Sequence, residues 1–238
     1  MVMSRARVKR PYIKASDLDN EARRFLQDLY PTALYYPINV PVVQIAAEMG
    51  VTIISHLLLS EDFSIYGIMC FSDGEVDVFD ETTGYYTSLQ VKAGTMLIDP
   101  RTKFDRNIGC FNNTVAHELF HWYRHRDYFQ SLDVGYGLAV IATRCTLAQV
   151  DGETSFIKES DLDWIEWQAT SIAPRILMPR ESFEMVAYKS INNYKGCFRT
   201  GNQYLHQVIT DVVSEFRVSR QSACIRLKEA GLMPYFSK

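Results

Sequence analysis

The spacing of apolar residues predicts two helices near the start of the chain. Between residues 16 and 29, apolar side chains recur every three or four positions: Leu18, Ala22, Phe25, Leu26 and Leu29. This helix must stop before Pro31, because a proline restricts the residue that precedes it. A second helix is predicted from Pro41 to Gly50, since proline is favoured in the first helical turn and glycine just after the last.

From Val51 the hydrophobic period shortens and predicts strands. The segments with β-branched, aromatic or alternating apolar residues are 51–56, 65–71, 76–79, 85–91 and 95–98. A turn is expected at Ser72-Asp73-Gly74, and Asp99-Pro100 ends the last strand. Strands that follow each other this closely favour an antiparallel, meander-like sheet, so we expect an α+β fold.

Helical spacing resumes in the second half of the chain. One helix is predicted from Ser160 or Asp161, with Pro174 breaking or kinking it and Leu177-Met178-Pro179 closing it. Further helices are predicted at 180–188, 203–216 and 219–230. Residues 127–159 fit strands or a loop folded over a cleft equally well.

Composition narrows the class of protein. The chain has 238 residues, is 47% hydrophobic and carries a net charge of −3, which suits a packed core and excludes a strongly basic nucleic-acid or membrane binder. Residues 1–15 form a locally basic arm, which we expect to be solvated; no apolar run follows it, so no signal peptide is expected. The five cysteines form no CxxC pair, which favours a reducing, cytoplasmic location.

The strongest chemical signal is His117-Glu118-Leu119-Phe120-His121, within a helix predicted over 115–124. Histidines four apart lie on one helical face and can bind one metal ion, while the intervening glutamate can act as general base. Asn112 and Asn113 are the predicted N-caps. The alternative is an amphipathic helix whose solvated side carries these polar residues.

A catalytic zinc site needs a third protein ligand. The third histidine of an HExxHxxGxxH pattern is absent, and one helix can hardly supply three tetrahedral ligands, so His125 is expected at the surface or behind the ligands. A later carboxylate is the other solution, and Glu166 is favoured because a carboxylate in mid-helix beside tryptophans needs a partner. The other acidic residues considered are Glu153, Glu159, Asp161 and Asp163.

Taken together, three segments resemble the ImmA/IrrE family of zinc metallopeptidases: His117–His121, Glu166-Trp-Gln-Ala169 and Ala173-Pro-Arg-Ile-Leu-Met-Pro179. Val212–Ser219 resembles the family's ending, and the resemblance spans about Pro37 to Leu232. It implies a zincin-like domain over 16–188 with a helical region over 189–238.

The resemblance also implies the roles of the site residues. His117, His121 and Glu166 would hold Zn²⁺, and Glu118 would be the general base. Two residues depart from the family pattern: Phe120 replaces a glycine, which we expect to tighten packing behind the helix, and Thr170 replaces an asparagine, which weakens any role carried over to that position.

These features predict a zinc-dependent endopeptidase, and the resemblance implies a regulatory protease that cleaves a protein such as a transcriptional repressor. The strand Thr95–Ile98, just before the histidine helix, is the expected edge strand for an extended substrate.

A regulator that binds DNA or a protein partner is the rival hypothesis. Residues 208–231 resemble a helix–turn–helix, whose second helix carries four polar residues able to contact DNA: Arg220, Gln221, Arg226 and Lys228. Because the chain is acidic, direct nucleic-acid binding is not expected, and a structural or docking use is favoured. A further rival is an inactive peptidase fold that only binds its partner.

Overall fold

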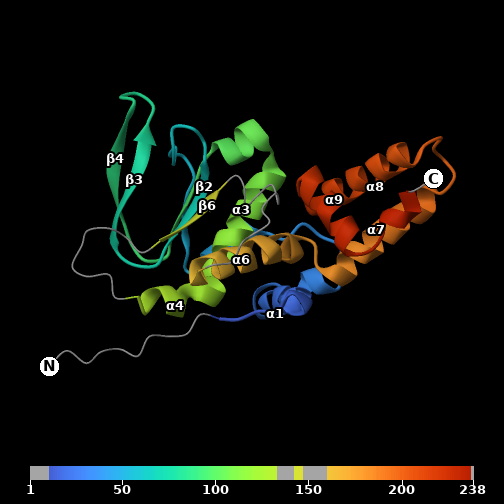
Figure 1. Cartoon of the computed structure of the whole chain (residues 1–238), viewed down its shortest axis with the longest axis horizontal. Helices are drawn as coiled ribbons and strands as arrows, with labels where there is room; N and C mark the ends of the chain where they lie inside the picture. Colours follow the sequence, from blue (N-terminus) through green and yellow to red (C-terminus); the bar gives the residue numbers. More distant parts are fainter. Residues whose placement is uncertain (1–10, 133–141, 147–159, 237–238) are drawn as a thin grey trace.

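The computed structural model describes residues 11–132, 142–146 and 160–236, which form an α+β fold with a mixed sheet (Figure 1). The sheet has the strand order β1 (Thr52–Ile54), β5 (Thr95–Ile98), β2 (Ile65–Cys70) and β6 (Ala142–Thr146). β1 and β5 are parallel, whereas β2 is antiparallel to both β5 and β6. The strands β3 (Gly74–Asp80) and β4 (Tyr85–Val91) form a separate hairpin.

The predicted strands are therefore present, but the meander-like pairing is wrong. β5 does not lie at an edge, because β1 pairs with one side of it and β2 with the other. The turn expected at residues 72–74 does not pair β2 with β3; β3 instead pairs with β4. Alternation along a strand shows which side chains share a face, but it does not identify the neighbouring strand.

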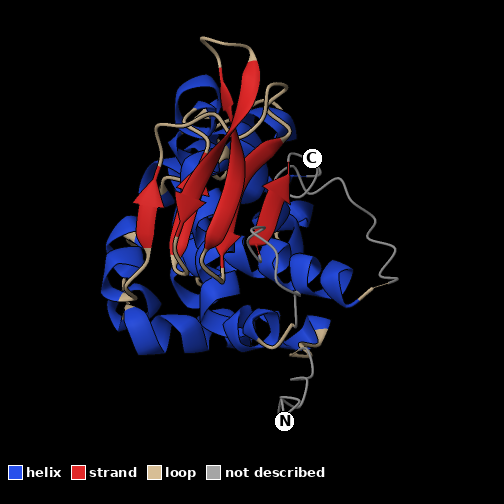
Figure 2. Cartoon of the chain, turned by 90° about the vertical axis from the view of Figure 1, so that its left-hand side faces the viewer, coloured by secondary structure: helices blue, strands red, loops and turns tan. Residues whose placement is uncertain are grey.

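Both faces of the four-stranded sheet are covered, which explains its nearly continuous apolar strands. Ile68 and Leu97 point to one face and pack with Val76 and Val78 of the hairpin. Met69, Met96 and Ile98, one position away, point to the other face and pack with the helices. Figure 2 shows the strands in front of the helical layer. The molecule therefore has three layers: the β3–β4 hairpin, the four-stranded sheet and the helices.

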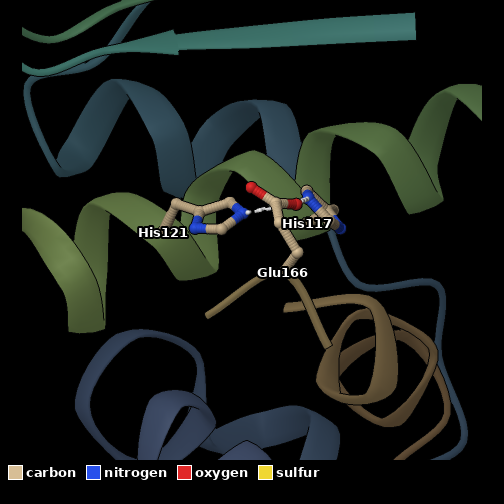
Figure 3. Close-up of side chains that lie close together, drawn as sticks. All are labelled: His117, His121 and Glu166. Carbon is tan, nitrogen blue, oxygen red and sulfur yellow. Dashed lines mark hydrogen bonds and ion pairs between the residues drawn. The ribbon is translucent and has the colours of Figure 1, made fainter. Parts of the chain in front are cut away.

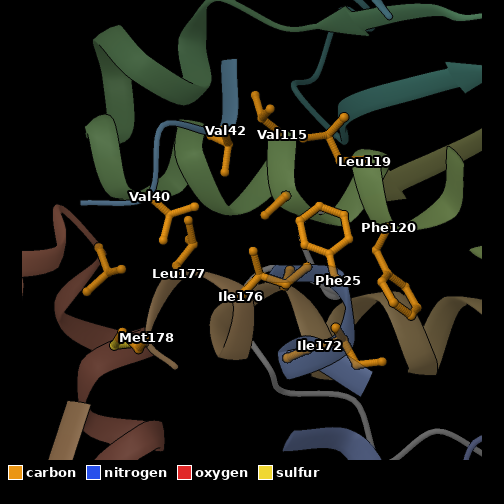
Figure 4. Packing of buried hydrophobic residues seen from close by; sticks show 14 of the residues in the cluster. Phe25, Val40, Val42, Val115, Leu119, Phe120, Ile172, Ile176, Leu177 and Met178 are labelled. Carbon is orange, nitrogen blue, oxygen red and sulfur yellow. The ribbon is translucent and has the colours of Figure 1, made fainter. Parts of the chain in front are cut away.

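The helical layer supports the central helix, α3 (Ile108–Phe120). It packs between the sheet and α6 (Asp161–Leu177), and α1 (Leu18–Leu29) packs on α6. Phe25, Val115 and Ile172 meet in this fully buried core (Figure 4). The first two predicted helices are confirmed as α1 and α2 (Val42–Glu48). Short 3-10 or π-helical turns occupy Ala15–Asp17, Pro31–Leu34, Thr102–Arg106 and Met233–Phe236.

The histidine helix begins earlier than predicted. Its N-cap is Asn107, whose side chain accepts a hydrogen bond from the Cys110 amide at 2.9 Å. Asn112 and Asn113 lie inside the helix instead, so the predicted caps are wrong. After Phe120 the helix continues as a π-helical turn, His121–His125, and then as α4 (Arg126–Gln130). Such π turns are frequent at functional sites.

From residue 160 onwards the described part of the chain is helical, as predicted. Ser160 caps α6 in a capping box with Asp163, and α6 runs through Pro174 without breaking. Three helices follow at one end of the molecule: α7 (Arg180–Tyr194), α8 (Gly201–Phe216) and α9 (Arg220–Glu229) (Figure 1). The expected boundary between residues 188 and 189 falls inside α7, and one hydrophobic core runs through both parts.

The end of the basic N-terminal arm is packed rather than solvated. Ile13 is buried in the main core, and the ring of Tyr12 lies 5.8 Å from that of Trp164 on α6. Residues 1–10 lie outside the described part of the chain. Among the described residues, none of the helices has the length and apolar character needed to cross a membrane.

Candidate metal centre

Three side chains of the kinds that bind metal ions converge where α3 faces α6 (Figure 3). The Nε2 atoms of His117 and His121 lie 3.0 Å apart. Oε2 of Glu166 lies 3.3 Å from Nε2 of His117 and 3.5 Å from Nε2 of His121. Both histidines are buried, and 16% of the Glu166 side chain is exposed. Two histidines four positions apart and a glutamate 45 positions after the second thus present two nitrogens and an oxygen to one point.

This donor set fits a zinc ion. Imidazole nitrogens and a carboxylate oxygen are ordinary zinc ligands, and donors about 2.0–2.2 Å from a tetrahedral ion lie roughly 3.3–3.6 Å apart. The three observed separations, 3.0, 3.3 and 3.5 Å, are close to this range. Three protein ligands leave a fourth position for water or substrate, as in catalytic rather than structural zinc sites.

Two neighbouring imidazoles favour the charged form of the Glu166 carboxyl. Burial by itself would raise the pKa of this carboxyl, but the imidazoles of His121 and His117 outweigh burial through charge and hydrogen bonding. The pKa of Glu166 is therefore lowered, and the carboxylate is ready to act as an anionic ligand.

Glu118 lies next to this cluster but has a different environment. Its side chain is fully buried, and Oε2 accepts a hydrogen bond from the Thr143 hydroxyl on β6 at 3.1 Å. Burial raises the pKa of Glu118 to about 8; His121 counteracts the rise, and the nearby Glu166 carboxylate adds to it. Within the described residues, Oε1 of Glu118 has no hydrogen-bond partner. A buried carboxyl of this kind suits proton transfer.

A glycine on β2 makes room for this carboxyl. A Cβ atom on Gly67 would lie 2.9 Å from Oε1 of Glu118 and 2.8 Å from Cγ2 of Thr114. Both distances are shorter than real Cβ contacts allow, so a side chain here would displace α3 or Glu118. Gly67 therefore holds the sheet close to the candidate site.

His125 lies behind the cluster and is fully buried, so its expected place behind the ligands is confirmed and a surface position is excluded. Its Nδ1 lies 3.0 Å from Nδ1 of His121, and its Nε2 lies 3.1 Å from Oε1 of Gln168. Burial, and then the charge of His121, lower the pKa of His125 well below its ordinary value. The imidazole is accordingly neutral at neutral pH.

The predicted cluster His117, His121 and Glu166 is brought together, with Glu118 beside it. Of the other carboxylates considered, Asp161 and Asp163 lie in the first turn of α6, where Asp163 completes the capping box of Ser160. Glu153 and Glu159 lie outside the described residues. Sequence reasoning missed Gly67, Thr143 and Gln168, because no pattern links their segments to the histidine helix.

Phe120 and Thr170, the two residues that depart from the family pattern, have different surroundings. The buried ring of Phe120 meets the His125 imidazole edge-on, with ring centroids 5.3 Å apart, so the expected packing behind the helix is confirmed. The hydroxyl of Thr170 is buried without a hydrogen-bond partner among the described residues.

Comparison with known proteins does not add to this geometry. No protein-family model, curated protein or solved structure matches the chain. The ImmA/IrrE resemblance stays a prediction from the motifs.

Proposed function

We propose that this protein is a zinc-dependent endopeptidase with a zincin-like fold. The observation that carries the proposal is the convergence of His117, His121 and Glu166 within 3.5 Å of one another, beside the buried carboxyl of Glu118. A zinc ion bound here would supply Lewis acidity, which polarises a substrate carbonyl and makes water a better nucleophile at neutral pH.

In this proposal a residue of the chain carries out the proton transfer. Glu118 accepts the proton of the attacking water and passes it to the amine that leaves when the peptide bond breaks. Burial raises its pKa, so that Glu118 can hold the proton between these two steps. The Thr143 hydroxyl, 3.1 Å from Oε2, holds the carboxyl in place.

The substrate would lie along β6 rather than along β5. β5 is paired on both sides, whereas β6 pairs only with β2 among the described strands. Thr143 places β6 beside Glu118. An extended peptide that pairs with this strand would pass the site, which favours a protein substrate. The ImmA/IrrE resemblance makes a transcriptional repressor the substrate that we propose.

Metal content tests the proposal first. We expect about one zinc per chain in the purified wild type by elemental analysis, and loss of that zinc in His121→Ala and Glu166→Ala. His206→Ala is the matched control, because His206 is exposed on α8 and should leave the zinc in place. A wild type that holds no metal even after zinc is added back would contradict the proposal.

Glu118→Gln separates binding from chemistry. The amide keeps the size of the side chain but cannot take a proton, so this variant should keep its zinc, lose hydrolysis and retain the substrate. Proteins captured by the variant, compared between cells with and without the wild type, would identify the cleaved partner. Unchanged cleavage by Glu118→Gln would exclude this residue as the base.

The rival DNA-binding hypothesis finds little support. Arg226, one of the four expected DNA-contacting residues, is 3% exposed and bonded to Asp19 and Glu229. Arg220 bonds to the hydroxyl of Thr210 on α8. Arg226 therefore stabilises the helical region, whereas Arg220 and Lys228 are exposed.

A further inference from the structure

A cavity of about 550 Å³ lies beside α7 and α8, at the end of the molecule opposite the β3–β4 hairpin (Figure 1). This connector cavity is lined by residues between 191 and 204 together with Pro234 and Tyr235, so the connector from α7 to α8 forms much of its wall. Its volume falls within the range of about 300–1,000 Å³ that small-molecule sites occupy. None of the residues of the candidate metal centre lines it, so a ligand here would be distinct from the proposed substrate.

Aromatic rings from four segments line this cavity. They are Tyr194 at the end of α7, Phe198 in the connector, Tyr204 on α8 and Tyr235 in the last turn. The hydroxyl of Tyr204 donates to the carbonyl of Ile191, and its ring packs against that of Phe198, with centroids 6.3 Å and planes 25° apart. Phe198 and Tyr235 are nevertheless 37% and 51% exposed. Exposed rings on a fixed backing offer faces on which a planar aromatic ligand can stack.

The charged side chains of this lining are all cationic. Among the described residues it includes Lys195 and Arg199 and no carboxylate. A second cavity between α7 and α8 differs, because Lys189 shares it with Asp211 and Glu215. Two cations in one lining repel each other, and a phosphate group, which carries more than one negative charge at neutral pH, offsets that repulsion. A guanidinium also matches phosphate oxygens through paired hydrogen bonds.

We propose that the connector cavity binds a nucleoside phosphate. The base stacks against the exposed rings of Phe198 and Tyr235, and the phosphate bonds to Arg199 and Lys195. A cavity of this size suits a single nucleotide, whereas a nucleic-acid strand needs an extended cationic groove and the chain carries a net charge of −3. The proposal does not depend on peptidase activity, because the cavity and the candidate metal centre share no residue.

Titration of the full-length protein tests this directly. AMP, GMP, CMP and UMP are each titrated by ligand-detected NMR, with adenosine and inorganic phosphate as partial ligands. We expect at least one nucleotide to bind with a dissociation constant below about 1 mM. Adenosine and phosphate should bind about tenfold more weakly than AMP, because each makes only part of the contacts. Failure of all four nucleotides to bind below that concentration, or equally tight binding of either partial ligand, would overturn the proposal.

Two exposed substitutions separate the parts of the site. Phe198→Ala removes a stacking ring and should weaken nucleotide binding about tenfold. Arg199→Gln should weaken it about tenfold while leaving adenosine unaffected. Lys189→Gln is the matched control, because this cation lines the second cavity and should leave every affinity unchanged. Equal losses in Arg199→Gln and Lys189→Gln would overturn the site, and if Phe198→Ala does not fold, Arg199→Gln decides alone.

A single-stranded oligodeoxyadenylate distinguishes a nucleotide site from a nucleic-acid surface. We expect it to bind no more tightly than the best mononucleotide. Binding more than about tenfold tighter, weakened by Arg220→Gln on α9, would overturn the proposal in favour of the rival nucleic-acid function. Absence of zinc from the wild type would contradict the peptidase proposal alone, since none of these titrations involves the metal.

Discussion

At the residue scale, Gly67 shows how closely the sheet approaches the candidate site. Its missing side chain leaves the volume that Glu118 and Thr114 occupy. The position lies where the pairing of β2 with β6 is irregular, between Ile65 and Gly67. Glycine is thus required by a close approach and not by an unusual backbone angle.

Gly67→Ala should therefore affect the site more than the fold. The added methyl group forces Glu118 or α3 to shift, which we expect to cost about 1–3 kcal/mol in urea unfolding and to abolish most of the proposed hydrolysis. Gly84→Ala is the control: its φ of +73° makes alanine unfavourable, but no atom lies within 4 Å of its Cβ position. It should lower stability and leave hydrolysis unchanged. Equal losses of hydrolysis in both variants would contradict a local effect at Gly67.

At the scale of elements, α9 is attached to the rest of the chain through Arg226. Its guanidinium bonds to Asp19 in the first turn of α1 and to Glu229 on α9 itself. It also donates to the carbonyl of Met178, the residue after α6. It also lies over the ring of Phe183 on α7, 5.7 Å from the centroid. Four helices therefore meet at one buried cation.

Arg226→Ala should be strongly destabilising. Removing the cation breaks its bonds to Asp19, Glu229 and the Met178 carbonyl, while Arg175 still contacts both carboxylates, so we expect a loss of about 1.5–3 kcal/mol in urea unfolding. Lys228→Ala, an exposed change on the same helix, should alter the free energy of unfolding by less than about 0.5 kcal/mol. If both variants instead lost DNA binding at equal stability, the rival function would be favoured.

The sequence predicted where helices and strands lie more accurately than it predicted which of them pair or pack together. Helical spacing located α1 and α6, and the i, i+4 histidines and the mid-helix Glu166 were sufficient to predict the cluster. Strand pairing could not be predicted, since alternation along β5 is the same for a central and an edge strand. The interior position of His125 depends on α6 covering the back of α3, a tertiary contact that leaves no local signal.

At the scale of the whole molecule, the helical region is fastened to the histidine helix. A Cβ atom on Gly109, in the first turn of α3, would lie 2.2 Å from the backbone of Val218 and Ser219 in the turn between α8 and α9. One turn further, the Asn112 side chain donates to the carbonyl of Arg217 at 3.1 Å. The helix–turn–helix-like segment thus serves as a support for α3.

Gly109→Ala should disturb this contact directly. The methyl group overlaps backbone atoms that cannot rotate away, so we expect a loss of more than about 2 kcal/mol in urea unfolding. Ile108→Ala, at the exposed neighbouring position, is the control and should cost less than about 1 kcal/mol. Hydrogen exchange should show faster opening of both α3 and α8 in Gly109→Ala. Faster exchange of α8 alone would mean that the two elements are not coupled.

This contact also has a consequence for biosynthesis. Asn112 and Arg217 are 105 positions apart, so the ribosome releases the histidine helix long before it releases the turn that supports its first residues. Glu166, the third member of the cluster, also emerges after the histidines. A nascent chain that ends before Arg217 therefore lacks part of the frame on which the candidate metal centre rests, and the site is completed only when synthesis is nearly finished.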